Sequence, residues 1–330
     1  MTSTQALNVH GVALLFESEF PQHLERLRED YGGFFVEDAA TDPLLFVVAT
    51  QPPTIDVGAP RAQFDGVLGD HFTVGERGVL LHGPQAGSPP AYEAEVRAYF
   101  TATVLNGLVT QRGGNLFHSS SVVGSHGAVM LAGAKKMGKS SLAMLCSLDG
   151  AEYMSNDMSV LTTQHDAGLS VMGLPQPISL APGAMDWFSR RRAMAGIGGA
   201  STTLDESLDA MSRYVLEVGD KSRIGRPLLS QFTTVRHTAA PLGALVFPEP
   251  GLTLAEPRAR LLHRDEAAAR LAMLAETFLK WSWPVPLSAE QLLDRSRSLI
   301  LSAVDSVPSY HLQWCADHDR NIDLLRELVL

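Results

Sequence analysis

The sequence is poor in cysteine. Cys146 and Cys315 are the only two among 330 residues, and they lie far apart. This spacing excludes a disulfide framework and leaves no Cys-x-x-Cys pair of the kind that holds a metal ion. We therefore expect a protein of a reducing, cytoplasmic compartment.

Basic charge and long apolar runs are also scarce. Lys and Arg number 26 against 36 Asp and Glu, a formal net charge of −10. An extended nucleic-acid surface would need an excess of basic residues on one face. The longest apolar runs, such as 44–49, are far too short to span a membrane, and no basic start followed by an apolar core opens the chain. We expect neither nucleic acid nor membrane as a partner, and no export.

The chain is 45% hydrophobic and alternates short apolar runs, helical stretches and glycine turns, which predicts a globular α/β protein. We expect three parts. Residues 1–112 read as a small α/β domain that could bind an acceptor, 113–260 as a central α/β domain, and 261–330 as a helical region. The Arg-, Gly- and Ser-rich segment 184–214 predicts a loop that could act as a lid. The sequence also predicts helices at 92–111, 266–279 and 290–304.

A phosphate-binding motif lies in the central domain. The residues Gly-Ala-Lys-Lys-Met-Gly-Lys-Ser from Gly133 to Ser140 fit G-x-x-x-x-G-K-[ST], after an apolar run and before a helical stretch. In such a loop backbone N–H groups hold phosphate oxygens, Lys139 reaches the β- and γ-phosphates, and the Ser140 hydroxyl coordinates Mg²⁺. The expected nucleotide-binding residues are Gly133, Ala134, Lys135, Lys136, Met137, Gly138, Lys139, Ser140 and Ser141.

The motif alone does not separate a kinase from an ATPase, a GTPase or a motor, because all of them use the same loop. The sequence has no Asn-Lys-x-Asp guanine motif. The candidate acid Asp157 precedes the expected strand 158–161, whereas an ordinary Walker B acid follows its strand. Both features argue against the common families that carry this loop, and they leave ATP and GTP open.

Taken together, several segments resemble the catalytic domain of HPr serine kinases, and more closely the HPr-kinase-related proteins of peptide-modification pathways. The segments are 116–123, 133–141, 154–161 and 241–247. The resemblance implies a phosphoenolpyruvate-carboxykinase-like nucleotide fold, ATP with Mg²⁺, and transfer of the γ-phosphoryl group to a serine hydroxyl of a peptide or protein. Since HPr kinases are hexamers, it also implies a homo-oligomer.

The resemblance assigns roles to individual residues. Asp157 matches the second acid of the family's pair, so we expect it to accept the hydroxyl proton and, with Ser140, to hold Mg²⁺. His118 is expected near the γ-phosphate and, with Lys139 and Asp157, forms the expected catalytic set. Asn156 stands where the family has its first acid, so either Asp157 serves both tasks or activity is weakened. The following segment also lacks the Glu and Arg of bacterial HPr kinases, which argues against the reverse, dephosphorylating reaction.

Two basic clusters follow these motifs in an otherwise acidic chain. We expect Lys221, Arg223 and Arg226 to contact phosphates or an acidic acceptor, because cations there would stabilise the transferring charge. The run 190–192 is the second cluster, and a solvated loop is its simpler interpretation.

The motifs leave two alternatives open. The acceptor could be a small hydroxylated molecule in place of a peptide or protein. The chain could also be a nucleotide-binding accessory protein with little catalysis, an interpretation that Asn156 favours.

Overall fold

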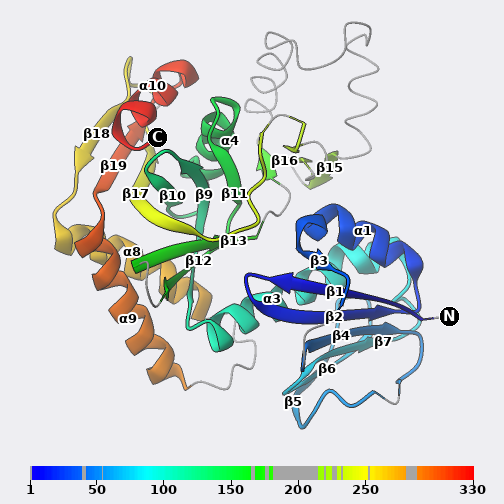
Figure 1. Cartoon of the computed structure of the whole chain (residues 1–330). Coiled ribbons are helices and arrows are strands. Elements are labelled where there is room, and N and C mark those ends of the chain that lie inside the picture. The colour runs from blue at the N-terminus through cyan, green and yellow to red at the C-terminus, as the bar shows by residue number, and fades with distance from the viewer. Residues whose placement is uncertain are drawn as a thin grey trace, which may run out of the picture. The chain divides into compact units, whose positions relative to one another are not determined.

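The computed structural model describes residues 2–38, 42–53, 55–164, 168–174, 178–180, 215–218, 221–224, 229–231, 233–251, 253–279 and 288–330 (Figure 1). It is a mixed α/β structure, as expected from the sequence. The chain divides into two compact units, Met1–Asn115 with Leu279–Asp294 and Leu116–Phe278 with Arg295–Leu330. The phosphate-binding motif belongs to the second unit.

In the first unit, the described strands form a mixed seven-stranded sheet in the order β3-β1-β2-β4-β7-β6-β5. The strands are β1 (Ser3–Val9), β2 (Val12–Ser18), β3 (Phe35–Val36), β4 (Leu44–Ala49), β5 (Pro60–Asp65), β6 (His71–Gly75) and β7 (Gly78–His82). The helices are α1 (Pro21–Tyr31), the short η1 (Gly32–Phe34) and α2 (Pro89–Ala91), a π-helical turn η2 (Tyr92–Val96), and α3 (Arg97–Gln111). The helix expected over 92–111 is confirmed, with its first five residues in the π-helical turn. Phe16 stacks on Phe46, and both rings pack edge-on against Phe100 of α3, which joins the sheet to its helix.

The second unit is built on a larger mixed sheet, whose described strands run β11-β9-β10-β17-β13-β12-β8, with β19 joined to β17 and β18 to β19. These strands are β8 (Asn115–Phe117), β9 (Ser119–Gly124), β10 (Gly127–Ala132), β11 (Glu152–Ser155), β12 (Ser159–Gln164), β13 (Gly168–Gly173), β17 (Ala240–Pro250), β18 (Arg258–Leu261) and β19 (Ser309–Trp314). A separate small sheet has the order β14-β16-β15. Its strands are β14 (Ile178–Leu180), β15 (Val215–Val218) and β16 (Lys221–Ile224).

Four helices of the described chain accompany the large sheet: α4 (Lys139–Leu148), α8 (Arg264–Leu279), α9 (Ala289–Ser306) and α10 (His318–Leu328). Alternate residues of a strand point to opposite faces, so each strand supplies two cores. Val129 and Leu131 of β10 share a core with α4 and α10, whereas Met130 shares one with α8 and α9. The sheet is therefore covered on both faces.

Strand direction brings several strand ends to one edge of this sheet. β10, β17 and β19 are mutually parallel, while β9 is antiparallel to both β10 and β11. The ends of β10, β11, β17 and β19 therefore meet the start of β9. In open α/β sheets the carboxyl ends of parallel strands are where ligands bind.

The last part of the chain, 261–330, was expected to be a helical region, and it also contains a strand. The helices expected at 266–279 and 290–304 are confirmed as α8 and α9, but β19 follows them and pairs in parallel with β17, from Leu245↔Ser309 to Pro250↔Trp314. An alternating six-residue strand between two helices gives a weak sequence signal, and its pairing partner lies far away in the sequence. The expected lid segment 184–214 lies outside the described residues. Among the described helices, none is long and apolar enough to cross a membrane.

His23 of α1 is a buried titratable group in the first unit. Its ring lies 5.3 Å from that of Phe20 and 5.5 Å from that of Tyr92, centroid to centroid, and the side chain is fully buried. Burial lowers the pKa of His23 to about 4, although a hydrogen bond with the Ser88 backbone opposes the shift. The folded protein therefore holds this imidazole neutral at a pH where the unfolded chain protonates it.

The free energy of unfolding is expected to fall as the pH is lowered from about 6.5 to about 4, by on the order of 2 kcal/mol from His23 alone. Above pH 6.5 the His23 imidazole is neutral in both the folded and the unfolded chain, so it adds no further pH dependence to the free energy of unfolding. Urea unfolding at pH 7 and pH 4.5 measures the loss, and His23→Phe is expected to remove this part of it. An equal pH dependence in the native chain and the variant would contradict the assignment.

Candidate nucleotide-binding site

The phosphate-binding motif forms a tight loop between β10 and α4. Gly138 is the N-cap residue that precedes α4, and its φ of 91° is left-handed, as is the φ of 69° at Lys136. Left-handed residues in a tight turn let successive backbone N–H groups point into one concavity, which suits an anion. The N-terminus of α4 adds its own N–H groups and the positive end of the helix dipole. The loop thus has the backbone shape of a phosphate cradle.

Lys139 points back across this loop. Its side chain belongs to a residue only 4% exposed, and Nζ donates a hydrogen bond of 2.9 Å to the Ala134 carbonyl. Lys135 and Lys136 at the loop tip are exposed. The buried ammonium therefore lies inside the cradle, while two further cations raise the positive potential at its rim.

A short hydrogen bond joins the loop helix to the turn that follows β11. The Ser140 hydroxyl donates to Oδ1 of Asn156 at 2.6 Å, and the Ser120 hydroxyl donates to the same oxygen at 3.4 Å. Asn156 is buried, so these bonds are shielded from water. The structure thus brings the expected Mg²⁺ ligand Ser140 against Asn156, the residue before the expected base.

The expected acid and histidine face one another at the same edge. His118 Nε2 lies 3.5 Å from Oδ1 of Asp157, and the His118 carbonyl accepts a 3.4 Å hydrogen bond from the Gly133 N–H. The His118 side chain is 14% exposed and that of Asp157 is 50% exposed. His118 therefore contacts the loop and the carboxylate together, and the carboxylate remains open to solvent.

Asp157 has a strained backbone. Its φ is 61°, and the Met158 N–H donates at 2.7 Å to the Asn156 carbonyl, closing a three-residue turn around Asp157. The turn lies near Tyr153, where burial, followed by the charge of Asp157, raises the pKa of the hydroxyl well above its usual value. The strained backbone of Asp157 persists only where surrounding contacts enforce it, and strain of this kind clusters at functional sites.

A buried serine cluster supplies those contacts, and sequence reasoning missed it. The hydroxyls of Ser121, Ser155 and Ser159 bond one another at 2.8–2.9 Å, and all three residues are fully buried. They come from β9, β11 and β12 and lie on both sides of the Asn156-Asp157 turn. A closed network of this kind orders the turn relative to β9. The Ser-rich sequence at 119–121 was its only signal.

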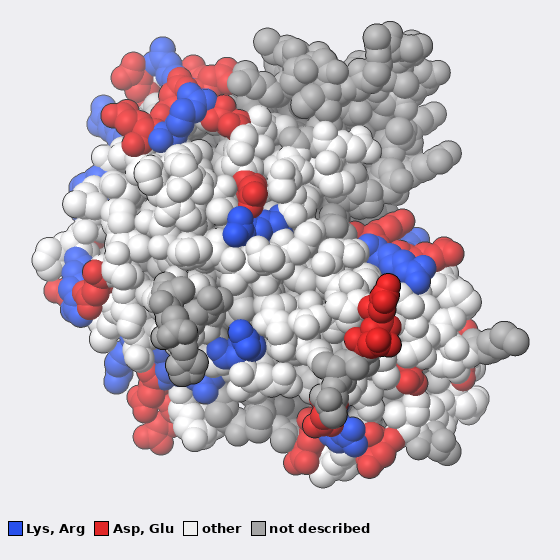
Figure 2. Space-filling model, viewed as in Figure 1, with Lys and Arg blue, Asp and Glu red and all other residues white. Residues whose placement is uncertain are grey.

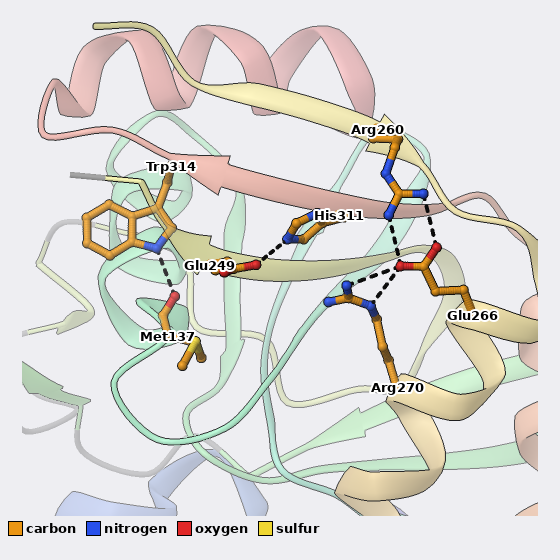
Figure 3. Close-up of polar contacts among 7 residues, drawn as sticks. All are labelled: Met137, Glu249, Arg260, Glu266, Arg270, His311 and Trp314. Atoms are coloured by element: carbon orange, nitrogen blue, oxygen red, sulfur yellow. Dashed lines mark hydrogen bonds and ion pairs between the residues drawn. The ribbon is translucent and has the colours of Figure 1, made fainter. Parts of the chain in front are cut away.

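Trp314 is the second residue that sequence reasoning missed. It ends β19 at the loop edge, and its indole Nε1 donates to the Met137 carbonyl at 2.9 Å (Figure 3). A Cβ on Gly138 would lie 2.7 Å from Cε2 and Nε1 of this indole. Figure 3 also shows His311 of β19 bonded to Glu249 of β17, at 2.6 Å. The ends of β17 and β19 thus flank the loop opposite His118 and Asp157.

The expected basic contacts lie partly outside the described residues. Lys221 and Arg223 belong to β16, where the strand is described without their side chains. Arg226 and the run 190–192 are outside the described part of the chain. Figure 2 shows that Lys and Arg on the viewed face are scattered among acidic residues.

The oxygen donors near the loop fit a hard cation. Among the described side chains, no three of His, Cys, Asp or Glu gather in a way that could hold a metal ion. Mg²⁺ in nucleotide sites usually needs only one or two protein oxygens, because phosphates and waters supply the rest. The hydroxyl of Ser140 and the carboxylate of Asp157 are oxygen donors of this type, and the two residues are linked through Asn156.

Gly138→Ala is expected to destabilise the protein more than Gly150→Ala, which makes a matched control at the other end of α4. Both glycines are left-handed, with φ of 91° and 106°, so each alanine loses about 1 kcal/mol from backbone strain. A Cβ on Gly150 has no atom within 4 Å, whereas one on Gly138 overlaps Trp314. We expect a total loss on the order of 3 kcal/mol at Gly138, measured by urea unfolding.

In a Trp314→Ala background the cost of Gly138→Ala is expected to fall to that of Gly150→Ala. Equal costs of the two alanine substitutions in the native background would contradict the close contact between loop and indole.

The arrangement at the loop has to be interpreted from its own residues. No known family model matches the chain, and no curated protein matches its sequence. The structure places three features at one edge of a mixed sheet. They are a loop with the shape of a phosphate-binding loop, an imidazole beside a carboxylate, and a serine hydroxyl that donates a hydrogen bond to an amide oxygen.

Proposed function

We propose that this chain is an ATP-dependent kinase that transfers the γ-phosphoryl group to a serine hydroxyl of a peptide or protein in the cytoplasm. The observation that carries the proposal is the convergence of His118, Asn156 and Asp157 beside the phosphate loop, through contacts of 2.6–3.5 Å. This type of loop occurs in kinases, ATPases, GTPases and motors. Here it lies near the solvent-exposed carboxylate of Asp157, a group that can take the proton of an acceptor hydroxyl.

The loop supplies the triphosphate site. Backbone N–H groups of the turn and of the α4 N-terminus would bind phosphate oxygens, and the buried Lys139 would neutralise charge on the outer phosphates. A protein of net charge −10 repels a triphosphate at long range, so binding depends on this local concentration of positive charge. Lys135 and Lys136 at the rim would offset part of that repulsion.

Asp157 is the proposed base. In the transfer step it accepts the proton of the serine hydroxyl while the new O–P bond forms and the bond between the γ-phosphorus and the β,γ-bridging oxygen breaks, which releases ADP. His118, 3.5 Å away, would orient the carboxylate and donate to the transferring phosphoryl oxygens. The exposure of Asp157 leaves room for a macromolecular acceptor to approach.

Ser140 and Asp157 would hold Mg²⁺, and the ion when bound would neutralise the phosphates and polarise the transferred group. Asn156 has a supporting role here, since its Oδ1 accepts a hydrogen bond from the Ser140 hydroxyl and leaves the lone pairs of that hydroxyl available to the ion. The proposed phosphoenolpyruvate-carboxykinase-like fold of the HPr kinase family would place its acid pair at this same turn.

A second candidate function is a nucleotide-binding accessory protein with little catalysis. The specific observation in its favour is that an amide, Asn156, contacts Ser140 where the resembled family has a carboxylate. With one carboxylate in place of two, the site binds a divalent cation less strongly.

The proposal is tested by incubating the native chain with [γ-³²P]ATP, Mg²⁺ and a panel of acceptor peptides and small hydroxylated molecules. Asp157→Asn is expected to lower label transfer at least about 100-fold while changing the affinity for ATP without Mg²⁺ less than about threefold, because the base acts only in the transfer step and the Mg²⁺ ligand acts only when the ion is present. Lys139→Ala is expected to lower both. Asp323→Asn, an exposed acid of α10, serves as the control and is expected to change neither.

Transfer that survives Asp157→Asn would refute the base assignment. ATP binding without label on any acceptor would favour the accessory protein. Label confined to the small molecules would show that the acceptor is a small hydroxylated molecule and not a peptide or protein.

Asn156→Asp is expected to lower the Mg²⁺ concentration for half-maximal transfer by roughly tenfold, since it adds a carboxylate beside Asp157 and keeps an oxygen for Ser140. Asn156→Leu removes that oxygen and is expected to raise the requirement. A Mg²⁺ dependence that is the same in all three proteins would show that this residue has no part in holding the ion.

A further inference from the structure

Trp314 is held on a rigid support at the end of β19. Its carbonyl accepts a 2.8 Å hydrogen bond from the Gly251 N–H. The backbone N–H and carbonyl of the next residue, Cys315, are both bonded at 2.9 Å to the side chain of the buried Asn321 in α10. The indole therefore projects from a backbone whose neighbouring polar groups are anchored on both sides.

The indole makes two contacts with consecutive loop residues. Nε1 donates to the Met137 carbonyl at 2.9 Å, and the same edge of the ring lies against Gly138, where an added Cβ would be 2.7 Å away. These residues follow the left-handed Lys136 and lead directly into α4. Trp314 thus contacts the loop at the point where the chain turns into α4.

The polarity of the peptide bond gives this contact a consequence. In a trans peptide the carbonyl of one residue and the N–H of the next point in opposite directions. A hydrogen bond that holds the Met137 carbonyl toward Trp314 therefore turns the Gly138 N–H away from Trp314. A carbonyl facing bound phosphates would repel them, whereas an N–H attracts them.

We propose that Trp314 is a positioning residue for the phosphate loop. Its N–H holds the Met137 carbonyl outward and its ring leaves space only for glycine at position 138, so the loop keeps its anion-binding shape before nucleotide arrives. The inference rests on the proposed nucleotide site. Trp314 lies 174 positions after Ser140, the last residue of the motif, and the pairing of β19 with β17 brings it to the loop. Preorganisation of this kind raises affinity because binding no longer has to order the loop.

The test compares three proteins by calorimetric titration with Mg·ATP and with Mg·tripolyphosphate, which lacks the nucleoside. Trp314→Phe keeps an aromatic ring and removes the N–H, and it is expected to weaken both ligands by five- to tenfold. Tyr310→Phe is the matched control, because it removes one polar group from the same face of β19 about 13 Å earlier along the strand. It is expected to change neither affinity.

A rescue variant separates positioning from general stability. The imidazole of a histidine overlays the pyrrole ring of indole with Nε2 at the place of Nε1, so Trp314→His is expected to recover part of the lost affinity even where it is less stable to urea than Trp314→Phe. A purely structural role would make affinity follow stability in all variants, and that result would overturn the inference.

The remaining outcomes distinguish the two proposals. Weaker binding of ATP with unchanged binding of tripolyphosphate would show that Trp314 contacts the nucleoside, which overturns loop positioning and leaves the nucleotide site intact. Unchanged affinity of Trp314→Phe for both ligands would also overturn loop positioning and leave the nucleotide site intact. A native chain that binds neither ligand would refute the proposed function, and the inference with it.

Discussion

The 2.6 Å hydrogen bond between Ser140 and Asn156 is the contact on which the rest of the site depends. It joins the first turn of α4 to the turn after β11. Together with His118, which contacts both the Gly133 N–H and the Asp157 carboxylate, this bond sets the position of the loop relative to Asp157. The buried serine cluster beneath the turn and the His118 contact on its outer side then leave the carboxylate in one position.

The last part of the chain holds the loop helix from outside. Trp314 contacts the loop just before α4 begins, and Arg326 of α10 forms a two-pronged ion pair with Asp149, which follows the last turn of α4. Between these ends, Ile322 and Leu325 pack in the same core as α4. A short helix of ten residues is marginal alone, so its stability and direction come from these tertiary contacts.

Local motifs made part of this arrangement predictable. The loop, α4, α8 and α9 follow from spacing and periodicity, and the resemblance to HPr kinases pointed to His118 and Asp157, which the structure brings within 3.5 Å of one another. Trp314 and the serine cluster could not be predicted, because their partners are set by strand pairings between distant segments. The sequence of 261–330 predicted helices and missed β19 for the same reason, because β19 forms a strand by pairing with β17, which lies far away in the sequence.

The most direct test of the central claim is a crystal structure of the native chain with Mg²⁺ and a non-hydrolysable ATP analogue. The account predicts phosphates bound by the N–H groups of Gly133–Ser140, the ion on the Ser140 hydroxyl, and the terminal phosphate facing the side of the loop that carries His118 and Asp157. An analogue bound elsewhere, or one whose terminal phosphate points toward Trp314 and away from Asp157, would contradict it.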